Sequence, residues 1–339
     1  MSNGSGNKLI LAIAVEATFG GAIGTQFPLA VVENNGFKNE ATAVFNESGM
    51  GSTYRYSNYK TEDRWSSFSV EVNIDENTFL IPFLQKYTIA SNLVPSDSGA
   101  YEHVLTYSNS NFLKSFRFTL VDPDRGSTAA PTLKTEEYKG CLISNIQFNQ
   151  VKGQFQTMTL EGIGIRSEHT VATVPAIDRI REFVGSQVVN QLVGTSSSFA
   201  DYQVITADHN LEFKLADIES VSPLGSSTLT SQAVLDDMYS VTLNALMPNK
   251  DIQDNYNNAT QLKYKTIITD TVRDIIGSTN NTKPSIIFEM PRVVINEYKE
   301  REGSMSELLR QTFTCTAIDI PSVTGSPASL IVRNNVASY

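Results

Sequence analysis

The residues that most often carry out catalysis or bind metals are few and widely separated in this sequence. The histidines, His103, His169 and His209, lie in polar, turn-like contexts that predict surface positions, whereas Cys141 and Cys315 each lie in an alternating apolar segment. The two cysteines lack CxxC spacing, so the cysteines and histidines do not fit the pattern of a structural zinc site. No Gly-x-Ser-x-Gly sequence is present to hold a serine nucleophile. We therefore predict no catalytic site and no metal site, with both cysteines buried as small apolar side chains.

Carboxylates are the other residues that could do chemistry, and the chain has 36 of them. A hydrolase that uses a carboxylate pair needs two acids roughly 5 to 10 Å apart across a cleft. The acids that could be drawn into such a pair are Glu71, Asp75, Glu161, Glu212 and Glu289. Because so many acids always offer some pairs, their number does not favour a hydrolase. The turn at residues 122–126 lacks the alternating acids and the final glutamate of a calcium loop.

Glycine-rich segments give no nucleotide site. Residues 20–24 and 162–164 resemble phosphate loops only superficially. A dinucleotide fingerprint needs a preceding strand, a helix that opens on the last glycine and an acid about 20 residues later. A phosphate loop needs Gly-Lys-Ser or Gly-Lys-Thr, which is absent here. We expect no cofactor.

Length and composition indicate a β-rich protein of two domains. The chain has 339 residues, of which 40% are apolar and 18% charged, and one core rarely organises so long a chain. The net charge of −10 disfavours a protein that grips nucleic acid through its phosphates. No stretch approaches the roughly 18 apolar residues of a membrane span, and the short apolar run at residues 9–15 is preceded only by the charge of Lys8. We expect a protein made and assembled in the cytoplasm.

Alternation of apolar and polar residues predicts most of the strands. In residues 67–74, Phe68, Val70 and Val72 alternate with Ser69 and Glu71, which is the pattern of a half-buried strand. The other predicted strands are residues 9–15, 27–33, 103–107, 112–121, 138–148, 154–165, 202–206, 211–218, 238–246, 262–269, 286–295, 309–320 and 330–332.

Two helices and two less regular segments complete the prediction. Asp75 can cap a helix over residues 76–87, whose apolar residues recur at helical spacing. Asp270 begins a second, shorter helix that stops at Gly277. The loop-like sequence of residues 34–61 predicts a long loop. Residues 177–193 fit a helix by periodicity but a strand or loop by their β-branched residues and glycine.

The order of these elements suggests an internal repeat. A strand over residues 67–74 and a helix from Asp75 recur as a strand over residues 262–269 and a helix from Asp270. Composition changes across residues 166–175. The sequence therefore predicts two β domains, residues 1–167 with the long loop at about 34–61, and residues 168–339.

Four segments resemble the tail tube proteins of long-tailed bacteriophages, the major tail protein family. Residues 12–21 are similar to that family's opening strand and its Glu-x-Thr-x-Gly turn. Residues 39–48 lead, as in the family, to a half-buried strand and a leucine-rich helix. Residues 137–146, which contain Tyr138-Lys139-Gly140-Cys141, are similar to its Tyr-x-Gly-Cys hairpin, and residues 288–293 to a late strand. Residues 177–193 and the polar insert at 249–260 depart from the family pattern.

The resemblance implies two tail-tube-like β-sandwich or barrel domains, each with a short flanking helix, and a structural role without catalysis. Family members pack into rings whose inner strands join into a barrel around a channel, and the rings stack into a tube in the virion tail. Three copies would form a pseudo-hexameric ring if the chain is duplicated, and six if its second half is an outer decoration. The implied partners are sister copies, the tape measure, tail terminator and baseplate or tip proteins, and passing double-stranded DNA that is not bound specifically.

Within this resemblance, two sets of residues are candidates for function. Acids on the inner strands would line the channel and repel DNA weakly. The repulsion reaches the DNA because the gap between wall and duplex is comparable to a Debye length of about 8 to 10 Å. The candidates are Glu71, Glu161, Glu212 and Glu289. Tyrosines of the long loop would contact the adjacent ring; the candidates are Tyr54, Tyr56 and Tyr59. The alternative is a virion-surface or secreted β-sandwich that binds carbohydrate, with exposed aromatic residues clustered beside Asn and Asp at one end.

Overall fold

The protein is mainly β, as its composition predicts. The computed structural model describes residues 10–47, 56–108, 114–122, 134–165, 168–170, 182–195, 197, 201–216, 234–246, 250–302, 310–318 and 327–339. Every pairing between the strands of these residues is antiparallel. None of the described helices has the length and apolar character that crossing a membrane would need.

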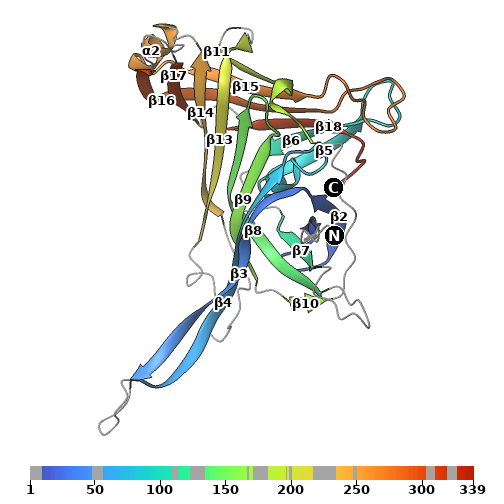
Figure 1. Cartoon of the computed structure of the whole chain (residues 1–339), viewed down its shortest axis with the longest axis vertical. Helices are drawn as coiled ribbons and strands as arrows, with labels where there is room; N and C mark the ends of the chain where they lie inside the picture. Colours follow the sequence, from blue (N-terminus) through green and yellow to red (C-terminus); the bar gives the residue numbers. More distant parts are fainter. Residues whose placement is uncertain are drawn as a thin grey trace, which may run out of the picture.

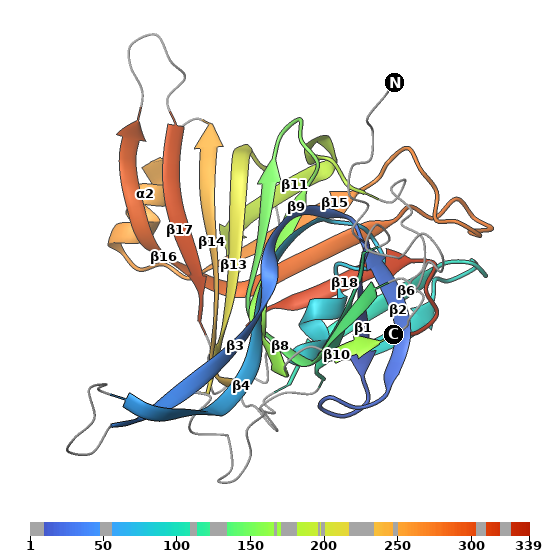
Figure 2. The same ribbon diagram turned by 60° about the horizontal axis from the view of Figure 1, so that its bottom comes forward.

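A large sheet, which we call the central sheet, runs through both halves of the chain (Figures 1 and 2). Its strands pair in the order β3–β4–β9–β8–β13–β14–β17–β16. Their bounds are β3 Val31–Glu47, β4 Tyr56–Asn73, β8 Lys134–Val151, β9 Thr157–Ile165, β13 Val204–Leu215, β14 Val234–Leu246, β16 Ser285–Glu302 and β17 Arg310–Ala317. Because β8 pairs with β13, the two predicted domains share one sheet.

Two smaller side sheets include the amino-terminal halves of β8 and β16. The first pairs in the order β2–β1–β7–β8–β10, and the second in the order β12–β11–β15–β16–β18–β6–β5. The bounds are β1 Ile10–Glu16, β2 Ile23–Leu29, β5 Tyr87–Leu93, β6 Tyr101–Tyr107, β7 Phe116–Asp122, β10 Glu168–Thr170, β11 Val188–Gly194, β12 Asp201–Tyr202, β15 Leu262–Thr269 and β18 Ser329–Asn334. Each side sheet therefore continues the central sheet through a single long strand.

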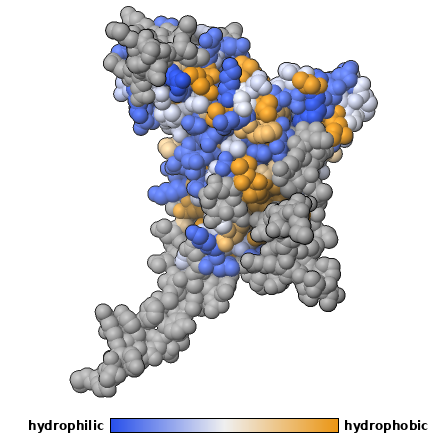
Figure 3. Space-filling view, viewed as in Figure 1, coloured by the Kyte–Doolittle hydropathy of each residue, from blue (hydrophilic) through white to orange (hydrophobic). Residues whose placement is uncertain are grey.

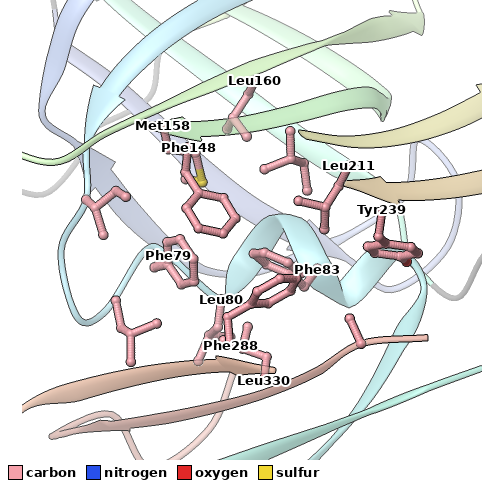
Figure 4. Packing of buried hydrophobic residues seen from close by; sticks show 14 of the residues in the cluster. Phe79, Leu80, Phe83, Phe148, Met158, Leu160, Leu211, Tyr239, Phe288 and Leu330 are labelled. Carbon is pink, nitrogen blue, oxygen red and sulfur yellow. The ribbon is translucent and has the colours of Figure 1, made fainter. Parts of the chain in front are cut away.

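The core lies between the central sheet and the second side sheet, with a short helical segment inside it. Phe79 and Phe83 come from the segment around the 3-10 helix η1 (Ile81–Gln85) and lie between Phe148 of β8 and Phe288 of β16 (Figure 4). The ring centroids of Phe79 and Phe148 are 5.4 Å apart, and those of Phe83 and Phe288 are 6.2 Å apart. All four rings are fully or almost fully buried. One continuous apolar core thus spans both halves of the chain.

The segment predicted as a long loop at residues 34–61 is instead a long hairpin. β3 and β4 pair along most of their length, with Phe37 opposite Phe68 and Phe45 opposite Tyr59, and the hairpin projects from the body (Figure 1). Repeated register shifts, such as the one between Ala41 and Ala43, break the apolar alternation. The prediction of a loop was wrong for that reason. Residues 48–55 lie outside the described residues.

The helix predicted over residues 76–87 is replaced by turns and the five-residue helix η1. Asp75 does act as a cap, since its Oδ1 accepts hydrogen bonds from the backbone N–H groups of Asn77 and Thr78 at 2.7 and 2.9 Å. Pro82 stands at the start of η1 and lacks the N–H that a longer α-helix would use. The predicted burial of the apolar residues is confirmed.

The helix predicted from Asp270 is also wrong. Asp270 Oδ1 accepts the backbone N–H groups of Val272 and Arg273, both at 3.0 Å, but residues 271–277 form a bend, irregular backbone and a turn. Its β-branched residues and Gly277 disfavour a helix. The described α-helix, α2 (Lys250–Asn257), lies in the polar insert instead, with Ile252 buried.

Most predicted strands are confirmed, with differences at their ends. The two strands predicted at residues 202–206 and 211–218 form β12 and the long β13, and the strand β5 was not predicted. In the ambiguous segment, residues 188–194 form β11, while residues 171–181 lie outside the described part. β10 pairs with β8, so residues 168–170 join the first half rather than the second.

A buried glutamate links two of the four segments that carry the family resemblance. Glu16, at the end of β1, has a side chain with no exposed surface and accepts hydrogen bonds from the backbone N–H groups of Gly20 and Gly140 at 2.9 and 3.0 Å. Ser115 Oγ donates to it at 2.7 Å, and Arg117 Nε lies 3.4 Å from it. Gly140 has a φ of +56°, a conformation that glycine adopts without strain. The carboxylate therefore holds the point at which β8 leaves the central sheet.

We predict that Glu16→Ala lowers the free energy of unfolding by about 3 to 5 kcal/mol, because it leaves Arg117 and two backbone donors without the buried charge they face. Urea denaturation followed by circular dichroism measures the change. The matched control is Glu161→Ala at an exposed position, for which the change is expected within about 0.5 kcal/mol. Equal effects of the two substitutions would contradict a structural role for Glu16.

Candidate functional site

One face of the central sheet is polar across its strands, and we call it the polar face. Directly opposed residues of antiparallel strands point to the same side, so the pairings define rows across the sheet. The rows are Glu71–Thr159–Gln147–Asn210–Ser240–Thr316, Asn73–Thr157–Asn149–Asp208–Thr242–Thr314 and Ser69–Glu161–Asn145–Glu212–Met238. In the space-filling view, hydrophilic residues extend along the body over β13 and β14 (Figure 3).

The opposite face of the same strands is the core. The residues that alternate with these rows, such as Val70, Leu160, Phe148, Leu211 and Val241, are no more than 1% exposed. The alternation has a period of two residues, which puts every second side chain on the same face. The central sheet is therefore a wall with one packed side and one side that the described residues leave partly exposed.

Three of the predicted acids lie together on the polar face. Glu161 is opposite Ser69 on one side and Asn145 on the other, and Asn145 is in turn opposite Glu212. Ser69 Oγ donates a hydrogen bond to Glu161 at 3.4 Å. Glu71 lies one row away, opposite Thr159. The structure thus brings Glu71, Glu161 and Glu212 to one surface.

Two further carboxylates on this face were missed by sequence reasoning. Asp208 lies opposite Asn149 and Thr242, and Asp236 lies opposite Lys214. Asp208 falls in the gap between the two strands predicted for this region, although its alternation with buried Ala207 and His209 could have revealed it. Burial raises the pKa of the Asp208 carboxyl.

Cations lie mostly at the margins of the polar face. Among the residues whose side chains are described, Lys214 is the cation on this face of the five middle strands β4, β9, β8, β13 and β14. The exposed Lys38 lies on β3, Lys299 on β16 and Arg310 on β17. The middle of the wall is therefore rich in carboxylates, amides and hydroxyls, with little positive charge to hold a phosphate backbone.

The remaining predicted residues lie elsewhere. Glu289 belongs to the amino-terminal half of β16, in the second side sheet, where its carboxylate is 2.9 Å from the Lys265 ammonium group. Tyr54 lies outside the described residues. Tyr56 and Tyr59 belong to the projecting hairpin, where their backbones pair opposite Glu47 and Phe45.

The central sheet ends in two open edges. Within the described residues, β3 pairs only with β4, and residues 294–302 of β16 pair only with β17. An edge strand presents backbone N–H and C=O groups that can pair with another strand. Because the two open edges are different strands at opposite ends of the sheet, they suit a head-to-tail contact between copies.

His209 supports the junction between the halves from the core side. Its ring stacks on Phe148 with the centroids 3.9 Å apart, and its Nε2 lies 2.8 Å from the hydroxyl of Tyr264. That hydroxyl donates to Asn190 Oδ1 at 2.5 Å. Burial lowers the pKa of His209 to about 3. The imidazole is therefore neutral at neutral pH and serves to join β8, β13 and β15.

His103, His209, Cys141 and Cys315 are all buried, although the sequence context of the histidines suggested surface positions. No group of three or more His, Cys, Asp or Glu in the described part of the chain is arranged to hold a metal ion. Cys141 and Cys315 are buried and free of disulfides, and burial raises the pKa of both thiols, that of Cys315 to about 12. Neither sulfur is a reactive thiolate at neutral pH.

No protein-family model matches this chain, and no curated protein sequence matches it.

We predict that acid destabilises the protein through His209. Between its ordinary pKa of about 6.5 and its folded value of about 3, the unfolded chain binds a proton that the folded chain does not. The free energy of unfolding therefore falls as pH falls through this window, by at most about 1.4 kcal/mol per pH unit for this group. Urea denaturation between pH 7 and 4 measures the slope.

In the variant His209→Gln, the difference in bound protons between the unfolded and folded chain is expected to fall by about one, because the titrating group is gone. The slope of the unfolding free energy against pH becomes correspondingly smaller. Burial also lowers the pKa of His103, so part of the slope remains. An unchanged slope in the variant would show that His209 is not the source of the acid sensitivity.

Proposed function

We propose that this protein is a structural subunit of a phage tail tube. Copies join side by side into rings, the rings stack into a hollow tube in the virion tail, and the channel conducts the DNA genome to the host. The observation that carries the proposal is the central sheet, which buries one face, presents a polar second face and ends in two open edges. Natural proteins normally cover such edges, and closure into a ring covers both.

The strand pairings support a duplicated chain. The pairings among β1, β2, β3, β4, β7, β8, β9 and β10 recur, in the same chain order, among β11, β12, β13, β14, β15, β16, β17 and β18. Only β5 and β6 lack counterparts among the described strands. This order equates β15 with β7 rather than with residues 67–74, so it replaces the repeat inferred from Asp75 and Asp270. Each copy would then supply two positions of a pseudo-hexameric ring, and three copies would complete it.

The contacts of the resembling motifs agree with the proposal. The Glu-x-Thr-x-Gly turn and the Tyr-x-Gly-Cys hairpin lie far apart in sequence, yet Glu16 of the first bonds to Gly140 of the second. This contact gives a physical reason for the two motifs to occur in the same protein. The long hairpin β3–β4 projects from the body (Figure 1) and would contact a neighbouring ring, with Tyr54, Tyr56 and Tyr59 as candidates for the contacts.

The polar face is the wall that we assign to the channel. Glu71, Glu161 and Glu212 share this face with hydroxyl and amide side chains. Negative charge repels DNA weakly, and uncharged polar groups form no strong bonds to phosphate, so the duplex can slide. Glu289 pairs with Lys265 in the second side sheet, so it is not part of the proposed channel wall.

The first test is microscopy of the purified protein. Negative staining is expected to show rings with a central hole, or tubes made of such rings, because open strand edges find partners at high concentration. Strict monomers at all concentrations would contradict the proposal. Monomers that also bind glycans would favour the carbohydrate-binding alternative.

The second test reverses charge on the polar face. Particles built with the triple variant Glu71→Lys, Glu161→Lys and Glu212→Lys are expected to release DNA more slowly, on the order of tenfold, since each lysine adds an attraction to phosphate. Release is followed by dye fluorescence after ejection is triggered.

The matched control is Asp201→Lys, Asp254→Lys and Asp274→Lys, which makes the same change in net charge at exposed positions outside the polar face. The control is expected to release DNA at the ordinary rate. Equal rates for the two triple variants in well-formed tubes would remove these acids from the channel wall.

A further inference from the structure

We infer that the carboxyl-terminal half of β16 of one copy pairs antiparallel with β3 of the next, in a register that repeats the pairing of β8 with β13 inside the chain. The inference rests on the proposed function and names the contact by which a ring closes.

Each open edge lacks the strand that the other edge supplies. The carboxyl-terminal half of β8 lies between β9 and β13. Its counterpart in β16 has β17, the counterpart of β9, on one side and no described partner on the other. β13 lies between β14 and β8, whereas β3 has β4, the counterpart of β14, and an open side. The in-chain junction is therefore a template for a junction between copies.

Irregularities in the ladders fix the alignment of the two halves. The β8–β9 pairing shifts register between Ile143 and Asn145, and the β16–β17 pairing shifts between Ile295 and Glu297. A bulge is a local feature that sets which residues oppose one another. Aligning the shifts equates Ile143 with Ile295, and four residues later Gln147 with Lys299.

The other side of the junction aligns in the same way. Asn210 lies opposite Ser240 of β14, and Lys38 lies opposite Ser67 of β4. Val241 of β14 pairs with Cys315, and its counterpart Phe68 of β4 pairs with Gly162. Ser240 and Ser67 each come one residue before these two core residues, so they are counterparts as well. Asn210 is therefore equivalent to Lys38.

The template then predicts one pair of opposed residues. Gln147 lies opposite Asn210 within the chain, so Lys299 of one copy lies opposite Lys38 of the next. All four residues belong to the polar face, and both lysines are exposed in the single chain. Two lysines face to face repel, and Glu297 occupies the position diagonal to Lys38.

The occupant of each edge is a second copy of this chain. A contact between two different edges is heterologous, and it generates a closed ring when the rotation between copies returns to the start. A junction that repeats the β8–β13 pairing would relate neighbouring copies as that pairing relates the two halves of the chain. No other protein need supply a strand.

Cysteine pairs test the contact. Opposed residues of antiparallel strands have Cα atoms about 4.5 to 5.5 Å apart, within the range that a disulfide spans. The double variant Lys38→Cys with Lys299→Cys, oxidised after assembly, is expected to give a ladder of covalent dimers and trimers on denaturing gels that reductant removes. The native Cys141 and Cys315 are buried and do not take part.

The template pair supplies the matched control. Gln147→Cys with Asn210→Cys is expected to close a disulfide within one chain and to give no ladder. Mixing the single variants Lys38→Cys and Lys299→Cys is expected to give dimers alone, while each single variant by itself gives none. This mixture keeps the test valid if the double variant assembles poorly.

Three outcomes separate the possibilities. Rings that give no covalent ladder, while the control pair closes, would overturn the contact and leave the proposed function intact. A ladder that continues to six would support the contact and contradict three copies per ring. Unmodified protein that forms no rings would overturn the proposed function, and the contact with it.

Discussion

Backbone hydrogen bonding between β8 and β13 is the interaction on which the rest of this structure depends. It joins the two halves of the chain into a single sheet of eight strands, and His209 seals it from the core side by stacking on Phe148. Sheet hydrogen bonds are made edge to edge, so joining two four-strand units covers one edge of each and leaves the other open. The unfinished edges of β3 and β16 follow directly from that geometry.

The bend in β8 is the second constraint. β8 changes partner from β7 to β9 beside Gly140, whose positive φ is a backbone conformation that other residues rarely adopt. The N–H of Gly140 then needs a partner, because an unpaired buried donor is costly. Glu16 provides it and is itself neutralised by the Arg117 guanidinium. One buried carboxylate thus stabilises the point at which β8 passes from the first side sheet into the central sheet.

Sequence reasoning succeeded where burial on one face imposes a short-range pattern. Residues 262–269 alternate cleanly and form β15 with the predicted bounds, and the apolar residues around Phe79 and Phe83 are buried as expected. It failed where the local pattern is interrupted. The hairpin β3–β4 carries several register shifts, and Pro82 and the β-branched residues after Asp270 prevented the two predicted helices. Alternation identifies the face of a strand on which an acid lies but not the sheet to which that strand belongs, so it does not separate Glu289 from Glu71, Glu161 and Glu212.

The amino-acid sequence by itself determined the β-rich class, most of the strands and the caps at Asp75 and Asp270, because each of these follows from side-chain type and from spacing of a few residues. Only the tertiary structure decided which strands are neighbours, which edges stay open and which acids share a wall. Strand partners such as β4 and β9 are separated by long stretches of chain, and their register depends on packing across the sheet rather than on any local signal.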